Sequence, residues 1–212
     1  MRLIPVRFPC GDLTLEGEWL FPDGEGPFPC VVVSHPFPPH GGSMQSSVVV
    51  AIWQALSRNS IAALRFNFRG VGNSEGNFGE GVAEREDVKA ALDFIASTKG
   101  IDTRRIGLAG YSFGAMMSVP VALRDERISM LALVSAPLTD TNWEKLNNYK
   151  KPCLLVVGEE DQMVSLELFR RQMEKSPDPT RYHIIRGADH FLAGYEEEVG
   201  RIVAQFFADG FK

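Results

Sequence analysis

Two kinds of hydrophobic pattern alternate along the chain. Near the N-terminus, Leu3–Phe8 and Leu13–Phe21 alternate apolar with polar residues, and Cys10-Gly11-Asp12 between them is typical of a hairpin turn. Later runs are apolar at most successive positions, as in strands of a parallel sheet that helices cover on both faces. These runs are Val31–Val33, Ile61–Phe68, Ile106–Ala109, Met130–Val134 and Leu154–Val157.

Segments with helical periodicity lie between these runs. In one of them, Val88, Leu92 and Ile95 recur at helical spacing, and we expect its charged residues on the opposite, solvent-facing side. Those charged residues are Glu84, Arg85, Glu86 and Lys89. Further helices are predicted at Val48–Leu56, Phe113–Leu123, Leu166–Met173 and Glu196–Phe207. A hairpin followed by repeated strand–helix units predicts an α/β fold with a mostly parallel, doubly wound sheet and antiparallel strands at one edge. No linker interrupts the 212 residues, so we expect a single domain.

Composition and charge narrow the class of protein. Apolar residues make up 44% and charged residues 23% of the chain, as in an average globular protein. The longest apolar run, Val48–Trp53, is far shorter than the about 18 residues of a membrane span. The net charge of −5 disfavours a nucleic-acid partner. Residues 1–7 contain charge and proline where a signal peptide has apolar residues, so we expect a cytoplasmic protein without membrane contacts, and a homodimer stays open.

The three cysteines do not indicate a metal site. Cys10, Cys30 and Cys153 are far apart, without the spacing of zinc ligands, and Cys30 and Cys153 each begin an apolar run. We therefore expect small buried side chains and no metal ion.

The segment Gly110-Tyr111-Ser112-Phe113-Gly114 carries the clearest chemical signal. It follows a short apolar strand and leads directly into a helical pattern, and small residues on both sides allow the sharp turn that exposes a nucleophilic serine. Gly72-Asn73-Ser74-Glu75-Gly76 has the same spacing, but neither a strand nor a helix adjoins it. Ser112 is the predicted nucleophile, and Ser74 is interpreted as a turn residue.

A serine hydroxyl needs a base, and the base needs an acid that fixes its tautomer. For a nucleophile on a strand–turn–helix, the acid and then the histidine follow in loops after later strands. His190 lies in such a loop, whereas His183 lies inside a strand-like segment and His35 and His40 precede the serine. Asp161 follows the apolar strand Leu154–Val157 and is the leading acid. Asp140 stays open as an alternative, and Asp189 is disfavoured because it adjoins the base.

Two backbone amides are expected to stabilise the oxyanion. One is the N–H of Phe113, directly after the nucleophile. The other should come from the loop after Val31–Val33, in which Pro36, Pro38 and Pro39 have no N–H, so Phe37 is the donor inside that run.

Together these motifs resemble the α/β-hydrolase superfamily. The match is greatest to its small bacterial esterases without a cap domain, which are related to dienelactone hydrolases and to the catalytic domains of prolyl-oligopeptidase-type enzymes. The matching motifs are the serine elbow, His35-Pro36, the loop Arg65–Gly76, Gly158-Glu159-Glu160-Asp161 and Asp189-His190-Phe191. The resemblance implies that Ser112, Asp161 and His190 are catalytic, with Phe37 and Phe113 as oxyanion donors.

Three departures qualify this resemblance. Dienelactone hydrolases use a cysteine where this chain has Ser112, and relatives often have a second histidine at the position of Phe37. Only Ser135–Lys151 separate the two strands between which a cap domain is usually inserted, enough for one short helix near Trp143. We therefore expect an open site without a lid.

The expected function is that of a serine carboxylesterase. Its substrates would be small uncharged esters with short, medium or aryl acyl groups, hydrolysed through an acyl-enzyme without metal or organic cofactor. Apolar side chains that flank the catalytic positions are predicted to contact the substrate; they are Phe37, Pro38, Tyr111, Met163 and Phe191. A peptidase or amidase, a perhydrolase, and a non-catalytic binding protein on the same fold stay open as alternatives.

Overall fold

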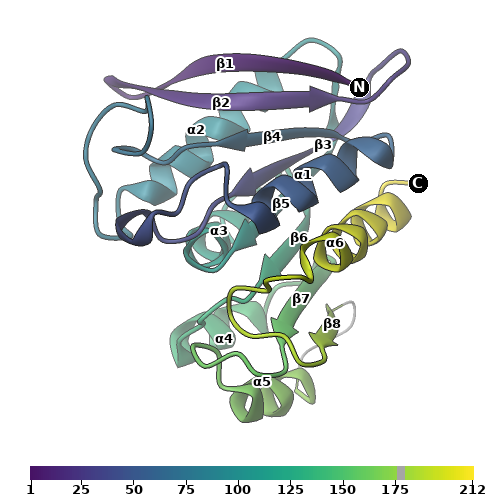
Figure 1. Ribbon diagram of the computed structural model, residues 1–212. Helices are drawn as coiled ribbons and strands as arrows, with labels where there is room; N and C mark the ends of the chain where they lie inside the picture. Colours follow the sequence, from purple (N-terminus) through teal and green to yellow (C-terminus); the bar gives the residue numbers. More distant parts are fainter. Residues whose placement is uncertain (176–179) are drawn as a thin grey trace.

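The computed structural model describes residues 1–175 and 180–212, and its strands form one eight-stranded sheet (Figure 1). The strand order is β1-β2-β4-β3-β5-β6-β7-β8. The strands are β1 (Arg2–Cys10), β2 (Leu13–Phe21), β3 (Phe28–Ser34), β4 (Ala62–Phe66), β5 (Ile101–Tyr111), β6 (Ile128–Val134), β7 (Cys153–Gly158) and β8 (Thr180–Ile185). β1 pairs antiparallel with β2 and β2 antiparallel with β4, whereas the other neighbours are parallel. The predicted sheet with an N-terminal hairpin at one edge is confirmed.

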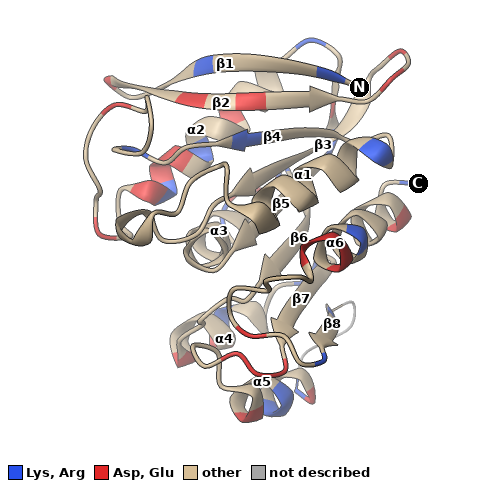
Figure 2. Cartoon of the chain, viewed as in Figure 1, with Lys and Arg blue, Asp and Glu red and all other residues tan. Residues whose placement is uncertain are grey.

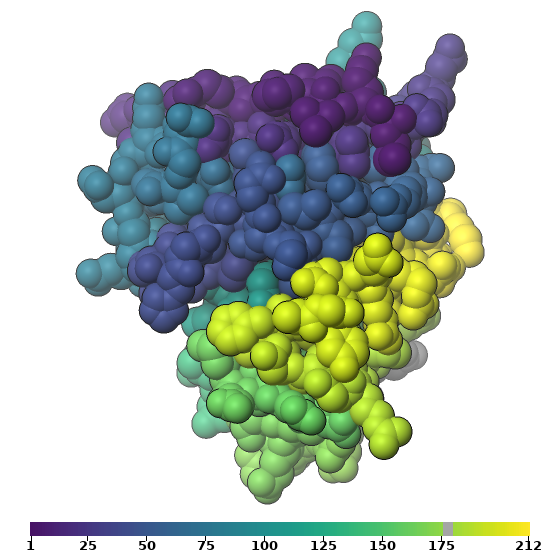
Figure 3. Space-filling model, viewed as in Figure 1, coloured from purple at the N-terminus to yellow at the C-terminus, as the bar shows by residue number. Residues whose placement is uncertain are grey.

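Helices cover both faces of the sheet. They are α1 (Ser47–Arg58), α2 (Glu84–Ser97), α3 (Phe113–Ala122), α4 (Asp140–Leu146), α5 (Leu166–Met173) and α6 (Glu196–Gly210), with a short 3-10 turn, η1 (Pro38–His40). α1 and α6 share one apolar cluster and lie side by side on the surface, as Figure 3 shows in blue and yellow. The apolar residues of α2, α3, α4 and α5 belong to the cluster on the other face.

The continuous apolar strands are explained by this two-sided cover. In β3, Cys30 and Val32 belong to the cluster under α2 and α3, whereas Val31 and Val33 belong to the cluster under α1 and α6. All four side chains are fully buried. A polar side chain at any of these positions would therefore be removed from water, whichever face of the sheet it pointed to. Figure 2 shows the consequence: β3, β6 and β7 carry no Lys, Arg, Asp or Glu.

Three details differ from the sequence expectations. β4 ends at Phe66, because Asn67 and Phe68 already belong to the following loop. β5 begins at Ile101 rather than near Ile106, since its polar start still pairs with Phe28 of β3. Glu84, expected on the solvent-facing side of α2, is fully buried, because its carboxylate accepts backbone hydrogen bonds from the preceding loop.

The connection from β6 to β7 contains only α4, which includes Trp143, as expected for a site without a cap domain. In the described part of the chain, no helix has the length and apolar character needed to cross a membrane.

Candidate active site

Ser112 lies on the sharp turn between β5 and α3. Its φ of 52° is in the left-handed region, which is strained for a residue with a side chain. Two glycines make the turn feasible: a Cβ on Gly110 would lie 2.5 Å from the backbone of Ala115, and one on Gly114 would lie 2.4 Å from the carbonyl oxygen of Ser34. The Ser112 N–H donates to the Val134 carbonyl at 2.8 Å, which fixes the turn against β6.

Three side chains from separate loops form one hydrogen-bonded line at the carboxyl end of the sheet. Ser112 Oγ lies 2.9 Å from His190 Nε2, and His190 Nδ1 lies 2.9 Å from both carboxylate oxygens of Asp161. A carboxylate can only accept, so Nδ1 carries the proton, and Nε2 of the neutral ring is left to accept the Ser112 hydroxyl proton. All three residues are buried, with 6 to 8% of their surface exposed.

The Asp161 carboxylate is held in its ionised form. Burial alone would raise the pKa of this carboxyl, but the hydrogen bond from His190 and those from the Val164 and Met163 amides outweigh it and lower the pKa. The two amides donate to Oδ1 at 2.9 and 2.8 Å. The loop after β7 therefore supplies a fixed negative charge behind the imidazole.

The alternative acids occupy other positions. Asp140 is exposed at the start of α4. Asp189 is also exposed, and its Oδ1 accepts from the N–H groups of Phe191 and Leu192 at 2.9 and 3.0 Å, which shapes the loop that carries His190. The structure therefore brings only Asp161, of these three carboxylates, to the imidazole.

Ser74 anchors a loop, as expected of a turn residue. Its hydroxyl donates to the Asn67 carbonyl at 2.7 Å and accepts the Glu16 N–H at 3.0 Å. These bonds hold the Gly-rich loop after β4 against β2. In the sequence, this loop is also distant from His190.

The three other histidines also differ in their surroundings. His35 is fully buried, with Nδ1 2.7 Å from the Pro36 carbonyl, and Nε2 accepts the Phe68 N–H at 3.0 Å. Burial lowers the pKa of His35 to about 4, although the hydrogen bond to the Pro36 carbonyl acts to raise it. The ring is therefore neutral. His183 is exposed on the edge strand β8, and His40 is exposed beside Phe37, with ring centroids 5.0 Å apart.

The two residues expected to supply the oxyanion donors have side chains that lie close together. The rings of Phe37 and Phe113 have centroids 5.5 Å apart. Phe113 is the first residue of α3, where a helix leaves its N–H groups without an internal acceptor. Within residues 1–175 and 180–212, the Phe37 N–H also has no hydrogen-bond acceptor. Both amides are therefore available to an incoming oxygen.

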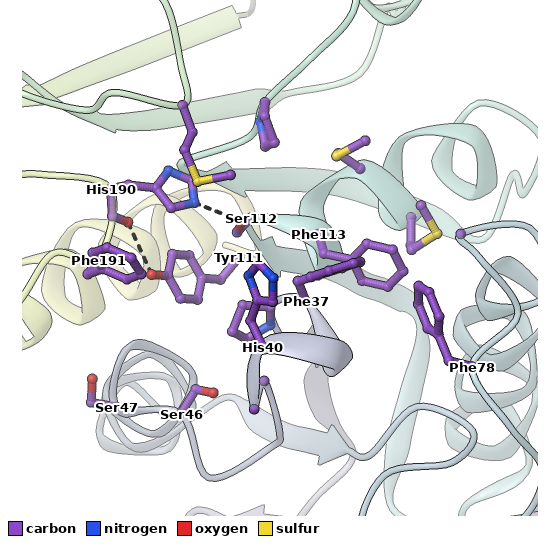
Figure 4. A pocket seen from close by; sticks show the side chains of 18 of the residues that line it. Phe37, His40, Ser46, Ser47, Phe78, Tyr111, Ser112, Phe113, His190 and Phe191 are labelled. Atoms are coloured by element: carbon purple, nitrogen blue, oxygen red, sulfur yellow. Dashed lines mark hydrogen bonds between the residues drawn. The ribbon is translucent and has the colours of Figure 1, made fainter.

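A pocket of about 830 Å³ surrounds Ser112 (Figure 4). Of the residues predicted to contact substrate, Phe37, Tyr111, Met163 and Phe191 line it. Burial raises the pKa of Tyr111 to about 12, and its hydroxyl donates to the His190 carbonyl at 3.1 Å. Pro38 is a correction: it begins the 3-10 turn η1, which turns the chain so that Pro36 and His40 line the pocket instead.

Several lining residues were missed by the sequence reasoning. They include His40, Ser46, Ser47, Phe78, Gly81, Met116, Met117 and Pro137. Met116 and Met117 could have been found, since they follow Ser112 by one helical turn. Phe78 had no such signal, because it lies in a loop whose return to the pocket depends on the tertiary fold. Among the described residues, no group of His, Cys, Asp or Glu is arranged to hold a metal ion.

Comparison with known proteins adds independent information. The sequence pattern of the alpha/beta hydrolase domain matches residues 30–201. A serine hydrolase homologue from Coxiella burnetii is similar in structure, with a TM-score of 0.84 and 32% identity over 95% of this chain and 96% of that one. A serine hydrolase without lid from Xanthomonas campestris has a TM-score of 0.83 and 25% identity over 97% and 94% of the two chains. Esterase EstD of Thermotoga maritima is 29% identical over 82% of this chain and 44% of its own length.

Proposed function

The chain belongs to the α/β-hydrolase family, and from this premise we propose that it is a serine carboxylesterase acting on small uncharged carboxylic esters through an acyl-enzyme. The observation that carries the proposal is the unbroken line from Ser112 Oγ through His190 to Asp161, with both intervals at 2.9 Å. A structural serine on a turn needs no neutral imidazole aimed at its hydroxyl.

In the first half-reaction, Ser112 Oγ attacks the ester carbonyl carbon while His190 Nε2 takes the hydroxyl proton. The carbonyl oxygen becomes an oxyanion, to which the N–H groups of Phe37 and Phe113 donate. The tetrahedral intermediate collapses, the bond to the alkoxy oxygen breaks, and His190 returns its proton to the leaving alcohol. Asp161 stays ionised and stabilises the transient imidazolium.

In the second half-reaction, water replaces the alcohol. His190 Nε2 removes a proton from this water as its oxygen attacks the acyl carbon, and the same two amides stabilise the oxyanion. Collapse then expels Ser112 Oγ, which recovers its proton from His190, and the carboxylic acid leaves. The cycle ends with the enzyme in its original protonation state.

The lining of the pocket supports an uncharged substrate. Its inner walls are aromatic rings and methionine side chains, which favour apolar groups. Glu80, Arg85 and Glu196 are the charged lining residues, and they include both signs. This mixture offers no cluster of cations to a phosphoester or a dicarboxylate.

Labelling with a fluorophosphonate probe tests the proposal, because the probe requires a serine activated by a base and an oxyanion hole. We expect mass mapping to find the label on Ser112, and we expect Ser112→Ala to abolish both labelling and hydrolysis of 4-nitrophenyl acetate. Ser74→Ala is the matched control and should keep both. Absence of labelling in the folded protein would refute the proposal and favour a non-catalytic binding protein.

A further inference from the structure

The pocket divides at Ser112 into two sides of different composition (Figure 4). On one side lie Phe37, Phe78 and Phe113, whose ring centroids are 5.4 to 5.8 Å apart in each pair. We call this side, together with the lining residues Met116 and Met117, the acyl lobe. On the other side, the centroid of the His190 ring lies 6.2 Å from the ring centroid of Tyr111 and 5.9 Å from that of Phe191.

The chemistry sets the direction in which an ester binds. His190 Nε2 must protonate the leaving oxygen, so the alcohol part of the ester lies on the side of His190. The acyl group is bonded to the opposite side of the carbonyl carbon and therefore extends away from His190. Figure 4 places the rings of Phe37, Phe78 and Phe113 in that direction. The acyl lobe thus contacts the part of the substrate that becomes the released acid.

One wall of the acyl lobe is a short strap, residues 78–82. A Cβ on Gly81 would lie 3.4 Å from Met117 Cε and 3.5 Å from Phe113 Cε2, so the backbone of the strap packs directly on the lobe. The Val82 N–H donates to the Gly79 carbonyl at 3.0 Å and closes a turn. Its two central residues, Glu80 and Gly81, both have positive φ values, 56° and 77°. Such a turn is unfavourable with Glu80 at its first central position, so it needs support from outside.

Glu84 supplies that support. Its carboxylate accepts the Gly79 N–H on Oε1 at 2.6 Å and the Gly81 N–H on Oε2 at 2.8 Å, and the residue is fully buried. Over the residues that the structure describes, this carboxylate has no ion pair, although it interacts electrostatically with Arg69, which pairs with Asp87 at 2.6 Å. Burying a carboxylate without an ion pair costs free energy, and here the hydrogen bonds from the Gly79 and Gly81 amides are what offset that cost.

We propose that Glu84 is a positioning residue for substrate selection: it fixes the strap as the wall of the acyl lobe and so favours esters of medium-chain or aryl acids over acetates. The inference rests on the proposed esterase function, since it assigns the lobe to the acyl group. It deepens that function by naming the part of the molecule that selects the acid.

The variant Glu84→Gln tests this assignment. It keeps the size of the side chain but replaces one accepting oxygen with an NH₂ group, so one of the two strap amides loses its acceptor. Glu86→Gln is the matched control, since Glu86 lies in the same first turn of α2, carries the same charge and is exposed. The substrates are 4-nitrophenyl acetate and 4-nitrophenyl hexanoate, which share a leaving group and differ only in the acyl part.

For Glu84→Gln we expect the hexanoate-to-acetate ratio of kcat/KM to fall about tenfold, the lower range for losing one apolar pocket contact. The fall should come from a higher KM for hexanoate, with kcat for acetate nearly unchanged. Equal losses for both esters, or the same change in Glu86→Gln, would assign Glu84 a general structural role and overturn the proposal.

A second variant covers the case in which Glu84→Gln does not fold. Gly81→Ala keeps the N–H group, adds a methyl group in contact with Met117 and Phe113, and strains the strap at a φ of 77°. It should also lower the hexanoate-to-acetate ratio, and an unchanged ratio would show that the strap does not border the acyl group. Failure of the wild-type protein to hydrolyse either ester would instead refute the proposed function itself.

Discussion

The buried imidazole of His35 makes the stability of this protein depend on pH. Both ring nitrogens are engaged: Nδ1 with the Pro36 carbonyl at 2.7 Å and Nε2 with the Phe68 N–H at 3.0 Å. Protonation of Nε2 would set two N–H donors against each other and place a positive charge at a site without exposed surface. Burial accordingly lowers the pKa of His35 to about 4 in the folded chain.

The direction and size of the effect follow from proton linkage. An unfolded histidine titrates near pH 6.5, so between about pH 6.5 and 4 the unfolded chain binds a proton that the folded chain does not. The contribution of His35 to the free energy of unfolding is therefore fully present above about pH 6.5, and it decreases as the pH falls toward 4. A difference of about 2.5 pH units corresponds to about 3 kcal/mol, of which about 2 kcal/mol is lost between pH 7 and pH 4.5.

Urea denaturation at pH 7 and at pH 4.5 measures this loss. His35→Gln keeps an acceptor for the Phe68 N–H but cannot be protonated, so its stability should change between the two pH values by about 2 kcal/mol less than that of the wild type. His183→Gln is the control, because His183 is exposed on β8 and should leave the pH dependence unchanged. The reasoning is refuted if wild type and His35→Gln lose the same stability on acidification.

Three further predictions concern single side chains of the site and its supports. Asp161→Asn should leave the fold intact but reduce kcat for 4-nitrophenyl acetate by about 10⁴-fold, because the asparagine amide no longer fixes the tautomer of His190. A loss of kcat below tenfold would contradict the role of Asp161 as the acid of the triad. Gly114→Ala places a methyl group 2.4 Å from the Ser34 carbonyl oxygen. It should lower the free energy of unfolding, measured by urea denaturation, by about 2 kcal/mol. A loss under about 0.5 kcal/mol would contradict the close packing of α3 against this carbonyl. Ser74→Ala removes one buried and one partly buried hydrogen bond and should cost about 1 to 2 kcal/mol of stability with ester hydrolysis retained. Loss of activity in a folded variant would restore Ser74 as a candidate nucleophile.

The parts of the fold that the sequence could predict are those set by local patterns. The apolar strands and the Gly-x-Ser-x-Gly turn are readable because burial on both faces and a sharp turn each restrict residue types over five or six positions. Asp161 and His190 were found in the same way, from their places just after strands. The structure brings His190 to Ser112 and Asp161 to His190. The lengths of the intervening loops alone could not have predicted these contacts.

Features that depend on contacts between distant segments were not readable. Periodicity assigned Glu84 to the solvent-facing side of α2, because a buried carboxylate is normally excluded from a helix–sheet interface. What overrides the pattern is a turn with two positive φ values that presents the N–H groups of Gly79 and Gly81 to this side chain. Pro38 was assigned to the pocket from its nearness to Phe37, but proximity along the chain does not say which way a 3-10 turn leads.

His35 connects stability to the proposed chemistry. Its Nε2 accepts from the backbone just after β4, and its Nδ1–H donates to the carbonyl of Pro36, the residue directly before the Phe37 amide. The single imidazole therefore links the loop that carries one proposed oxyanion donor to the segment that follows β4. Since the ring can make both bonds only when it is neutral, protonation of Nε2 breaks the bond from the Phe68 N–H while the Nδ1–H bond to the Pro36 carbonyl remains, so acidification loosens this link. His35→Gln, which cannot donate from the position of Nδ1, should thus lower kcat at pH 7, where the wild-type bond is intact. If kcat at pH 7 stays unchanged in this variant, the Pro36 carbonyl does not orient the donor.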